Sequence, residues 1–258
     1  MVKNMWTFLM TLAAVAAFVQ GHGRVMDPPG RGTLWRLGYS VRANYDDDGL
    51  NCGGFHHQHS VNEGRCGICG DPYDAADPKP HERGGIYDSG IIAASYEAGS
   101  IISVTVQLTA YHLGYWEFKI CPDPDYNGQD CFDNYILELE TGGTKYYPKN
   151  GSSTYLMNYR LPQGLSCEHC VLQWRYTCGN NWGNCNNGTE GLGCGNQENF
   201  GACSDISITG GSEPQTIPVD SLLLRKLSDL DRQTYRKPDK QTDRPTAYKI
   251  IPIRFPFL

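Results

Sequence analysis

The apolar and polar positions along the chain alternate as in short β-strands separated by turns. In residues 100–109, Ile102, Val104, Val106 and Leu108 alternate with polar or small residues, as a strand with one buried face requires. Similar segments occur at 115–121, 134–140, 154–162, 171–178 and 204–210. No long segment before residue 220 has helical periodicity. The pattern predicts an all-β protein, an antiparallel β-sandwich of the immunoglobulin/fibronectin-like type.

The first 21 residues depart from this pattern and have the features of a secretory signal peptide. Lys3 supplies a charged start, residues 8–19 are apolar, and Val19 and Gly21 are small enough for the −3 and −1 positions of a cleavage site. The apolar run is too short to span a membrane comfortably. Cleavage after Gly21 would make His22 the first residue of a secreted, extracellular protein.

The rest of the chain divides into two parts. Residues 22–211 suffice for one domain, and its first eighty residues are predicted as long loops held by cysteines. Residues 212–258 contain 9 Lys+Arg and 6 Asp+Glu interrupted by prolines, and they are predicted to be a mostly disordered extension after a short helix at 220–230.

Cysteine content supports export. All eleven cysteines are predicted to be disulfide candidates, because the compartment would be oxidising, and the odd number leaves at least one without an intramolecular partner. The sequence leaves the pairing open. The candidates are Cys52, Cys66, Cys69, Cys121, Cys131, Cys167, Cys170, Cys178, Cys185, Cys194 and Cys203. Two sequons, at Asn150 and Asn187, predict glycosylation in the same context.

The charge balance restricts the partner. Residues 22–211 contain 12 Lys+Arg and 22 Asp+Glu, which argues against nucleic acid and leaves neutral polymers or small molecules. The acidic runs 45–49 and 121–130 could supply a glycosidase carboxylate pair or bind Ca²⁺. Their turn-like composition favours solvated loops instead.

Most of the seven histidines are interpreted as structural or surface residues rather than metal ligands. His56, His57 and His59 form a dense group, but neighbouring histidines point in different directions and the loop is glycine-rich. His81 and His169 are predicted to be surface residues. The two C-x-x-C pairs are interpreted as disulfide cysteines rather than zinc ligands, because the protein is exported.

His112 and His22 favour a metal site. His112 ends the best strand, where functional groups are often displayed. A terminal His22 would chelate a metal through its α-amine and its ring Nδ1, and a second imidazole from His112 would complete a three-nitrogen T-shape. Such a donor set suits Cu(II), and the amine, with a pKa of about 7.7–8.0, can lose its proton to copper near neutral pH.

Five stretches, at 22–36, 51–71, 108–121, 161–183 and 195–208, give the chain a family resemblance. They contain Thr-Ala-x-His, Cys-x-x-Cys-Val-Leu-Gln-Trp, and Gln-Glu-x-Phe ahead of Cys-x-Asp-Ile. With a histidine directly after the signal peptide, the sequence resembles the lytic polysaccharide monooxygenases, most of all the arthropod-type auxiliary activity family 15. The tail beyond residue 211 lies outside the resemblance.

The resemblance implies one copper ion and a set of site residues. His22 and His112 match the copper ligands. Phe200 matches the axial position, where phenylalanine blocks rather than ligates, and Ala110 matches a small residue that shapes the other axial face. Glu198 matches a polar residue that hydrogen-bonds copper-bound oxygen, although its neighbour Gln197 could be confused with it.

The resemblance also implies the reaction. An electron donor, a small molecule or a protein, would reduce the copper, and O₂ or H₂O₂ would oxidise C1 or C4 of a β-1,4-linked insoluble polysaccharide. Chitin is favoured over cellulose by the usual hosts of the family. The enzyme would be a monomer without a membrane anchor after cleavage.

Three other functions are weighed against this one. A non-catalytic chitin- or polysaccharide-binding protein would lack tight copper binding at a processed His22. A hydrolase would release products without oxidised ends, and a copper storage or transfer protein would bind copper without oxidising a polymer.

Overall fold

The structure, a computed structural model, describes residues 22–126 and 128–210, so the predicted signal peptide and C-terminal extension lie outside it. These residues all belong to one compact unit within Met1–Gly211. The strands are β1 (His22–Asp27), β2 (Ala94–Glu97), β3 (Ile101–Ala110), β4 (Tyr115–Cys121), β5 (Glu138–Leu139), β6 (Thr154–Arg160), β7 (Cys167–Thr177), β8 (Trp182–Asn184), β9 (Glu190–Leu192) and β10 (Asn199–Thr209). The helical segments are a 3₁₀ turn (Leu34–Leu37), a π turn (His57–Val61) and α1 (Asp130–Asp133). No helix among the described residues is long and apolar enough to cross a membrane.

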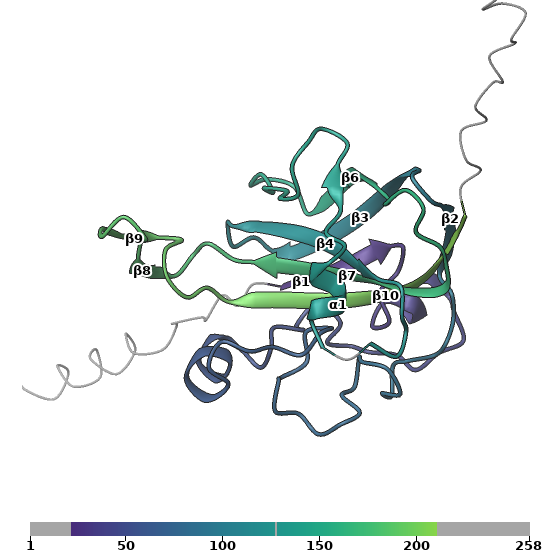
Figure 1. Cartoon of the computed structure of the whole chain (residues 1–258). Helices are drawn as coiled ribbons and strands as arrows, with labels where there is room; N and C mark the ends of the chain where they lie inside the picture. Colours follow the sequence, from purple (N-terminus) through teal and green to yellow (C-terminus); the bar gives the residue numbers. More distant parts are fainter. Residues whose placement is uncertain (1–21, 127, 211–258) are drawn as a thin grey trace, which may run out of the picture. The chain divides into compact units, whose positions relative to one another are not determined.

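Two four-stranded sheets face each other, in the orders β1-β3-β6-β5 and β2-β10-β7-β4, and β8 and β9 form a separate hairpin (Figure 1). The predicted all-β sandwich is confirmed. Its pairing is antiparallel except at one edge, where β2 runs parallel to β10. β10, the last strand described, therefore occupies an interior position in its sheet, between β2 and β7.

The core lies between the two sheets. The alternating residues predicted on β3 are all buried, and they face large aromatic side chains of the second sheet. Trp116 is fully buried and packs edge-to-face against Tyr176 and Trp174, with ring centroids 5.6 and 6.1 Å apart. Aromatic pairs at such separations stabilise a core beyond the area they bury.

At several places the strands differ from those that the sequence pattern predicts, and each difference has a local cause. β1 contains Gly23, whose missing side chain lets Leu108 and Trp174 approach closely; a Cβ there would lie 2.7 Å from Leu108 Cδ2. β10 buries the polar residues Ser204 and Asp205, which interrupt the apolar alternation. The predicted strand 134–140 is mostly a loop after α1, and only Glu138–Leu139 pairs with β6.

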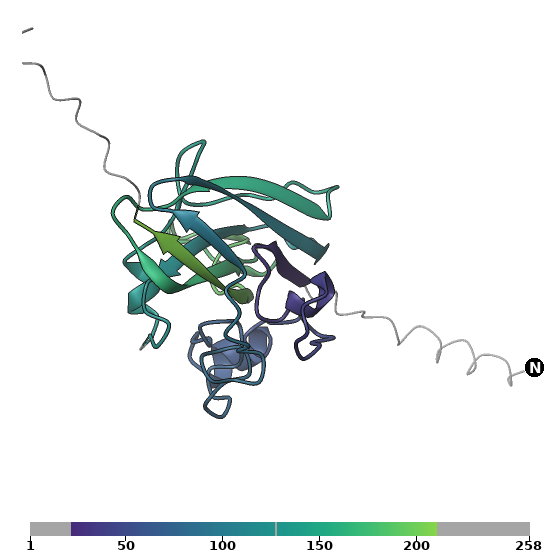
Figure 2. The ribbon, with the colours of Figure 1, turned by 90° about the vertical axis from the view of Figure 1, so that its right-hand side faces the viewer.

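The predicted long loops between β1 and β2 gather on one side of the sandwich (Figure 2). One of them touches β10 at Gly201, where a Cβ would lie 2.8 Å from the backbone nitrogen of Gly70. Gly70 itself has φ of 96°, which favours glycine. The Cys69–Cys203 disulfide fixes the same contact, so two independent devices attach this loop to the second sheet.

Ten of the eleven cysteines form five disulfides, as predicted for most of them. The pairs are Cys52–Cys66, Cys69–Cys203, Cys121–Cys131, Cys167–Cys170 and Cys185–Cys194. Cys178 is the remaining cysteine and is buried, which corrects its place among the disulfide candidates. All eleven lie within the described residues.

A buried ion pair joins the segment after β1 to β10. The Arg31 guanidinium donates from Nε and Nη2 to the two carboxylate oxygens of Asp205 at 2.7 and 2.6 Å. His169 also contacts the Asp205 carboxylate, at 2.8 Å. Burial alone would raise the pKa of Asp205, but the hydrogen bonds and charge of Arg31, with His169, bring it below its usual value.

Asp205→Asn should lower the free energy of unfolding by about 3–5 kcal/mol at pH 7, because it removes the hydrogen-bonded counter-ion of the buried Arg31 and leaves only Asp88, at 3.9 Å. Since the pKa is lowered in the folded state, the carboxylate stabilises the fold above its unfolded pKa of about 3.9 and loses that effect as the pH falls through the folded value. Denaturant unfolding at pH 7 and pH 3 measures this. An equal difference between the two proteins at both pH values would contradict it.

Candidate metal centre

The pairing of β1 with β3 brings His22 to the same edge of the sandwich as His112. His22 begins β1 and stands opposite Ala110, the last residue of β3, while His112 lies two residues beyond Ala110. His112 is buried and His22 is half-buried. Burial, and then the nearby charge of His22, lower the pKa of His112. The two histidines predicted to act together are therefore neighbours in the fold.

A tight turn fixes the backbone of His112. Leu113 and Gly114 have φ of 55° and 77°, and a Cβ on Gly114 would lie 2.0 Å from the carbonyl oxygen of Thr177. The Tyr176 hydroxyl accepts from the His112 backbone N–H at 3.3 Å and donates to the Leu113 carbonyl at 2.5 Å. The end of β7 therefore positions His112, and only glycine fits at residue 114.

Asn180 orients the His112 ring. Its amide nitrogen Nδ2 lies 3.0 Å from His112 Nδ1, so in this orientation the amide donates and Nδ1 accepts. Turning the amide over would place its oxygen on Nδ1, which would then keep the proton and leave the Nε2 lone pair available for a metal. An outer partner of this kind fixes both the tautomer and the ring plane of a ligating histidine.

Glu198 and Gln197, the two candidates for the polar residue beside the histidines, have different surroundings. The Gln197 side chain donates to the carbonyls of Asn181 and Cys194 and accepts from the Asn181 N–H, so it ties a loop together. The Glu198 carboxylate accepts one hydrogen bond, from Asn51 Nδ2 at 3.0 Å. Burial raises the pKa of Glu198, and the Asn51 hydrogen bond and the His22 charge offset only part of that rise. Glu198 is thus the carboxylate near the histidines.

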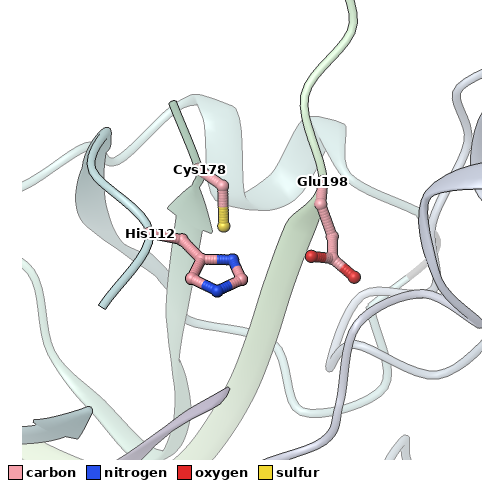
Figure 3. A group of neighbouring side chains, drawn as sticks. All are labelled: His112, Cys178 and Glu198. Atoms are coloured by element: carbon pink, nitrogen blue, oxygen red, sulfur yellow. The ribbon is translucent and has the colours of Figure 1, made fainter. Parts of the chain in front are cut away.

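His112, Cys178 and Glu198 form a buried group in which one ligand atom of each lies within 4.8 Å of the others (Figure 3). The three side chains come from the turn after β3, from just after β7 and from just before β10, and they point toward one another. Burial, with the nearby Glu198 charge, raises the pKa of the Cys178 thiol well above its usual value. Because the thiolate is the form that binds metals, Cys178 is expected to be a buried neutral neighbour of His112.

Phe200 and Ala110 border the same place. The fully buried Phe200 ring has its centroid 6.5 Å from that of His22 and 6.1 Å from that of Tyr176. It offers no donor atom. Ala110 is half-buried opposite His22. The sandwich edge therefore has an apolar wall below the histidines and a small residue beside them.

Several residues around the site were missed by sequence reasoning. They are Asn51, Tyr176, Cys178 and Asn180. Trp182 is 67% exposed and comes two residues after Asn180, in the β8–β9 hairpin. Asn180 lies in the turn-rich stretch 178–188, which has no periodic pattern, so only its closeness to the Cys-Gly pair after β7 could have indicated it.

Four of the other histidines make structural contacts. His57 contacts Asp74 at 2.7 Å and His59 contacts the Gln197 carbonyl at 2.8 Å, so the dense group is divided between different partners. His81, predicted at the surface, is buried against Asp71. His169, also predicted at the surface, is half-buried on Asp205.

The acidic run 45–49 is not the solvated loop that was expected. Asp47 is buried and pairs with Arg24 and Arg36, so its carboxylate stabilises the loop rather than acting as a glycosidase group. Both predicted glycosylation sites, Asn150 and Asn187, are exposed, and glycosylation there stays a prediction.

The donor set at this edge fits copper. It contains two imidazoles, and removal of residues 1–21 would add the α-amine of His22, giving three nitrogen donors. Nitrogen donors of this kind favour copper over hard cations, which prefer oxygen. The oriented His112 ring and the apolar wall at Phe200 agree with a built ligand site rather than with a chance meeting of two histidines.

Comparison with known proteins gives two kinds of match. Residues 22–206 match the family described as "Lytic polysaccharide mono-oxygenase, cellulose-degrading". The chain is similar to the structure of a lytic polysaccharide monooxygenase AA15 from Thermobia domestica in the Cu(I) state, at 47% identity and a TM-score of 0.70, over 72% of this chain and 98% of that one. An AA10 lytic polysaccharide monooxygenase from Streptomyces lividans matches at 17% identity and a TM-score of 0.40, over 72% and 99%. No curated protein matches significantly.

Proposed function

We propose that this chain, which belongs to the lytic polysaccharide monooxygenase family, acts on chitin, with cellulose as the second candidate substrate. The protein is a copper monooxygenase with the β-sandwich of that family. Its resemblance to arthropod-type enzymes supports chitin, whereas the family description names cellulose. The observation that carries the assignment of the site is the β1–β3 register, which sets His22 opposite Ala110 and so beside His112.

We infer that His22 and His112 hold one copper ion per chain. His22 would supply its ring and, after cleavage following Gly21, its α-amine, and His112 would supply the ring nitrogen that Asn180 does not contact. Copper bound there supplies one-electron redox chemistry with an external donor and activation of O₂ or H₂O₂. The donor would be a small molecule or a protein.

Glu198 is proposed to hold and move a proton at the reacting oxygen. Its carboxylate lies beside His112, and Asn51 fixes one of its oxygens. A carboxyl group in this position can donate a proton to one oxygen species and accept it from the next. Gln197 would support it indirectly, by holding the preceding loop to Asn181.

Phe200 and Ala110 are proposed to control access to the two histidines. The Phe200 ring has no atom that can ligate, so it would exclude water from the side facing the core. Ala110 leaves room on the opposite side, where a larger side chain would obstruct a small oxidant. Trp182, exposed on its hairpin, would lie flat against the sugar rings of an insoluble polymer.

The enzyme is proposed to be secreted as a monomer with residues 22–211 as its catalytic domain. Five disulfides agree with an extracellular protein of this family. The extension 212–258 is proposed to play no part in the site, since the family match ends at residue 206.

The test is to incubate the processed, copper-loaded protein with crystalline chitin and, separately, with cellulose, each with a reductant and O₂ or H₂O₂. Mass spectrometry of the soluble products should show oxidised chain ends from chitin, at C1 or C4. Oxidised ends from cellulose alone would transfer the assignment to cellulose. Binding to chitin with neither product would favour a non-catalytic binding protein.

A further inference from the structure

A charged cavity of about 640 Å³ lies on the outer face of the second sheet. Its floor consists of Glu117 and Lys119 from β4 and of Arg175 and Thr177 from β7, which alternate with core-facing residues of the same strands. Residues from the loop 65–82, with Tyr126 and residues of 128–133, form its walls. The volume lies in the range of small-molecule sites, and no residue of the proposed copper site lines it.

Arg175 is the unusual member of this cavity. It is half-buried, yet it makes no hydrogen bond or ion pair with any residue in the part of the chain that the structure describes. Burial lowers the pKa of the Arg175 guanidinium, and the charge of Asp133 offsets only part of that effect. An arginine keeps its charge under these conditions, so Arg175 lines the cavity with five N–H donors that make no hydrogen bond to a described residue.

The neighbouring acidic and basic groups have other partners. Glu117 stands opposite Arg175 in the strand register, but its carboxylate accepts from Thr144 Oγ1 at 2.8 Å. Asp133 is 2.5 Å from Lys119 Nζ. Glu82 accepts from the backbone N–H of Ile68 at 2.7 Å. The Arg175 charge is therefore the one that remains to be matched by a ligand.

The lining selects the charge of that ligand. Arg65 pairs with Glu63, Lys79 with Asp77 and Lys119 with Asp133, so Arg175 is the basic side chain of the lining that has no ion-pair partner among the described residues. A multiply charged anion such as phosphate would be repelled by the carboxylates of the lining. A planar carboxylate matches the guanidinium fork of Arg175 in two parallel hydrogen bonds.

The remaining polar groups select hydroxyls. Glu117 and Asp133 keep oxygens that can accept further hydrogen bonds, and Gln129 and Thr177 can both donate and accept. Tyr73 and Tyr126 add ring surfaces to the walls. A compound with one carboxylate and several hydroxyls satisfies such a lining, because its hydroxyls donate to the acids while its carboxylate binds the arginine.

We propose that this cavity binds a sugar acid, a polyhydroxylated monocarboxylate, with the carboxylate held by Arg175. An arginine held without a partner costs stability in the free protein, because its burial is not compensated. Arg175 is retained for binding rather than for folding, and the fold should tolerate its replacement.

Calorimetric titration of the full processed chain with four probes tests the proposal. D-Glucuronate represents the ring form of a sugar acid and D-gluconate the open-chain form. Glucose has the hydroxyls without a carboxylate, and acetate has the carboxylate without hydroxyls. One or both sugar acids should bind with one site per chain, and glucose and acetate should bind at least about 10-fold more weakly. Whichever sugar acid binds more tightly identifies the form recognised.

Arg175→Gln should weaken binding of the sugar acid by about 10–100-fold, the effect of losing a charge-assisted pair, and should leave the melting temperature equal or higher. Arg160→Gln, an exposed arginine on β6 in the other sheet, is the matched control and should bind like wild type. Equal binding by Arg175→Gln, equal binding of glucose or acetate, or no binding of either sugar acid would overturn the proposal.

A measurement on the wild-type chain covers the case in which Arg175→Gln fails to fold. Hydrogen exchange with a saturating sugar acid should slow in 115–121, 126–133 and 171–177 and stay unchanged in 154–160, on the other sheet. Protection on β6, or none in these segments, would overturn the proposal independently of any variant.

Discussion

Replacing His112 with alanine should abolish oxidised products from polysaccharide and remove tight copper binding, while the protein stays folded. The imidazole is one of the proposed nitrogen ligands, so its loss should cost more than the roughly 10–100-fold that substitutions of outer-shell partners cost. The fold should survive, because the turn is held by the backbone of His112 and by the Tyr176 hydroxyl rather than by the ring. Copper titration, product analysis and circular dichroism measure the three effects.

Two variants sharpen this result. His57→Ala removes a histidine that contacts Asp74 away from the site, and it should leave copper affinity and products unchanged. Glu198→Gln should keep the copper affinity and lose turnover, because the carboxylate is proposed to move a proton rather than to ligate. If His112→Ala bound copper like wild type, the Cys178 and Glu198 side of the group would become the better ligand candidate.

A chain in which the His22 α-amine is acetylated should lose tight copper binding. The acetyl group converts the α-amine into an amide nitrogen, which offers no lone pair to copper and, with no free amine beside it, keeps its proton near neutral pH. The proposed three nitrogens are then reduced to two imidazoles, and the chelate ring at His22 no longer forms. Isothermal titration with Cu(II) and the EPR spectrum of the bound ion should both differ from those of the chain with a free His22 amine.

The control for this experiment is the melting temperature without copper. It should be the same for the two chains, because His22 pairs with Ala110 through the backbone in either case. Equal copper affinity in the two chains would show that the α-amine is not a ligand. Intact mass and N-terminal sequencing of the secreted protein, made first, establish which start the cell produces.

The fold class and the closeness of His22 and His112 could be predicted because both rest on local features of the sequence, while copper binding by these histidines stays a prediction. The alternation in β3 marks a strand with one buried face, and His112 follows it directly. β1 could not be recognised in this way. It is a strand because Gly23 lets Leu108 and Trp174 close over it, and that contact joins residues far apart in the chain.

The surroundings of the site were harder to predict because they depend on long-range contacts. Asn51 meets Glu198 only because the Cys69–Cys203 disulfide and the Gly70–Gly201 contact bring its loop onto β10. The surface assignment of His81 failed for a similar reason. Its ring stacks on that of Tyr87, with centroids 4.5 Å apart, and contacts Asp71. No periodic pattern in that loop indicates either contact.

The interior position of β10 governs how this protein can be made. β7 and β2 cannot complete their sheet until Asn199–Thr209 has left the ribosome, since that strand lies between them. Cys69 must wait for Cys203, 134 residues later, whereas Cys52 has Cys66 within 14 residues. A chain made from its N-terminus therefore cannot complete this sheet, and Cys69 has no native disulfide partner, until most of the domain has been synthesised.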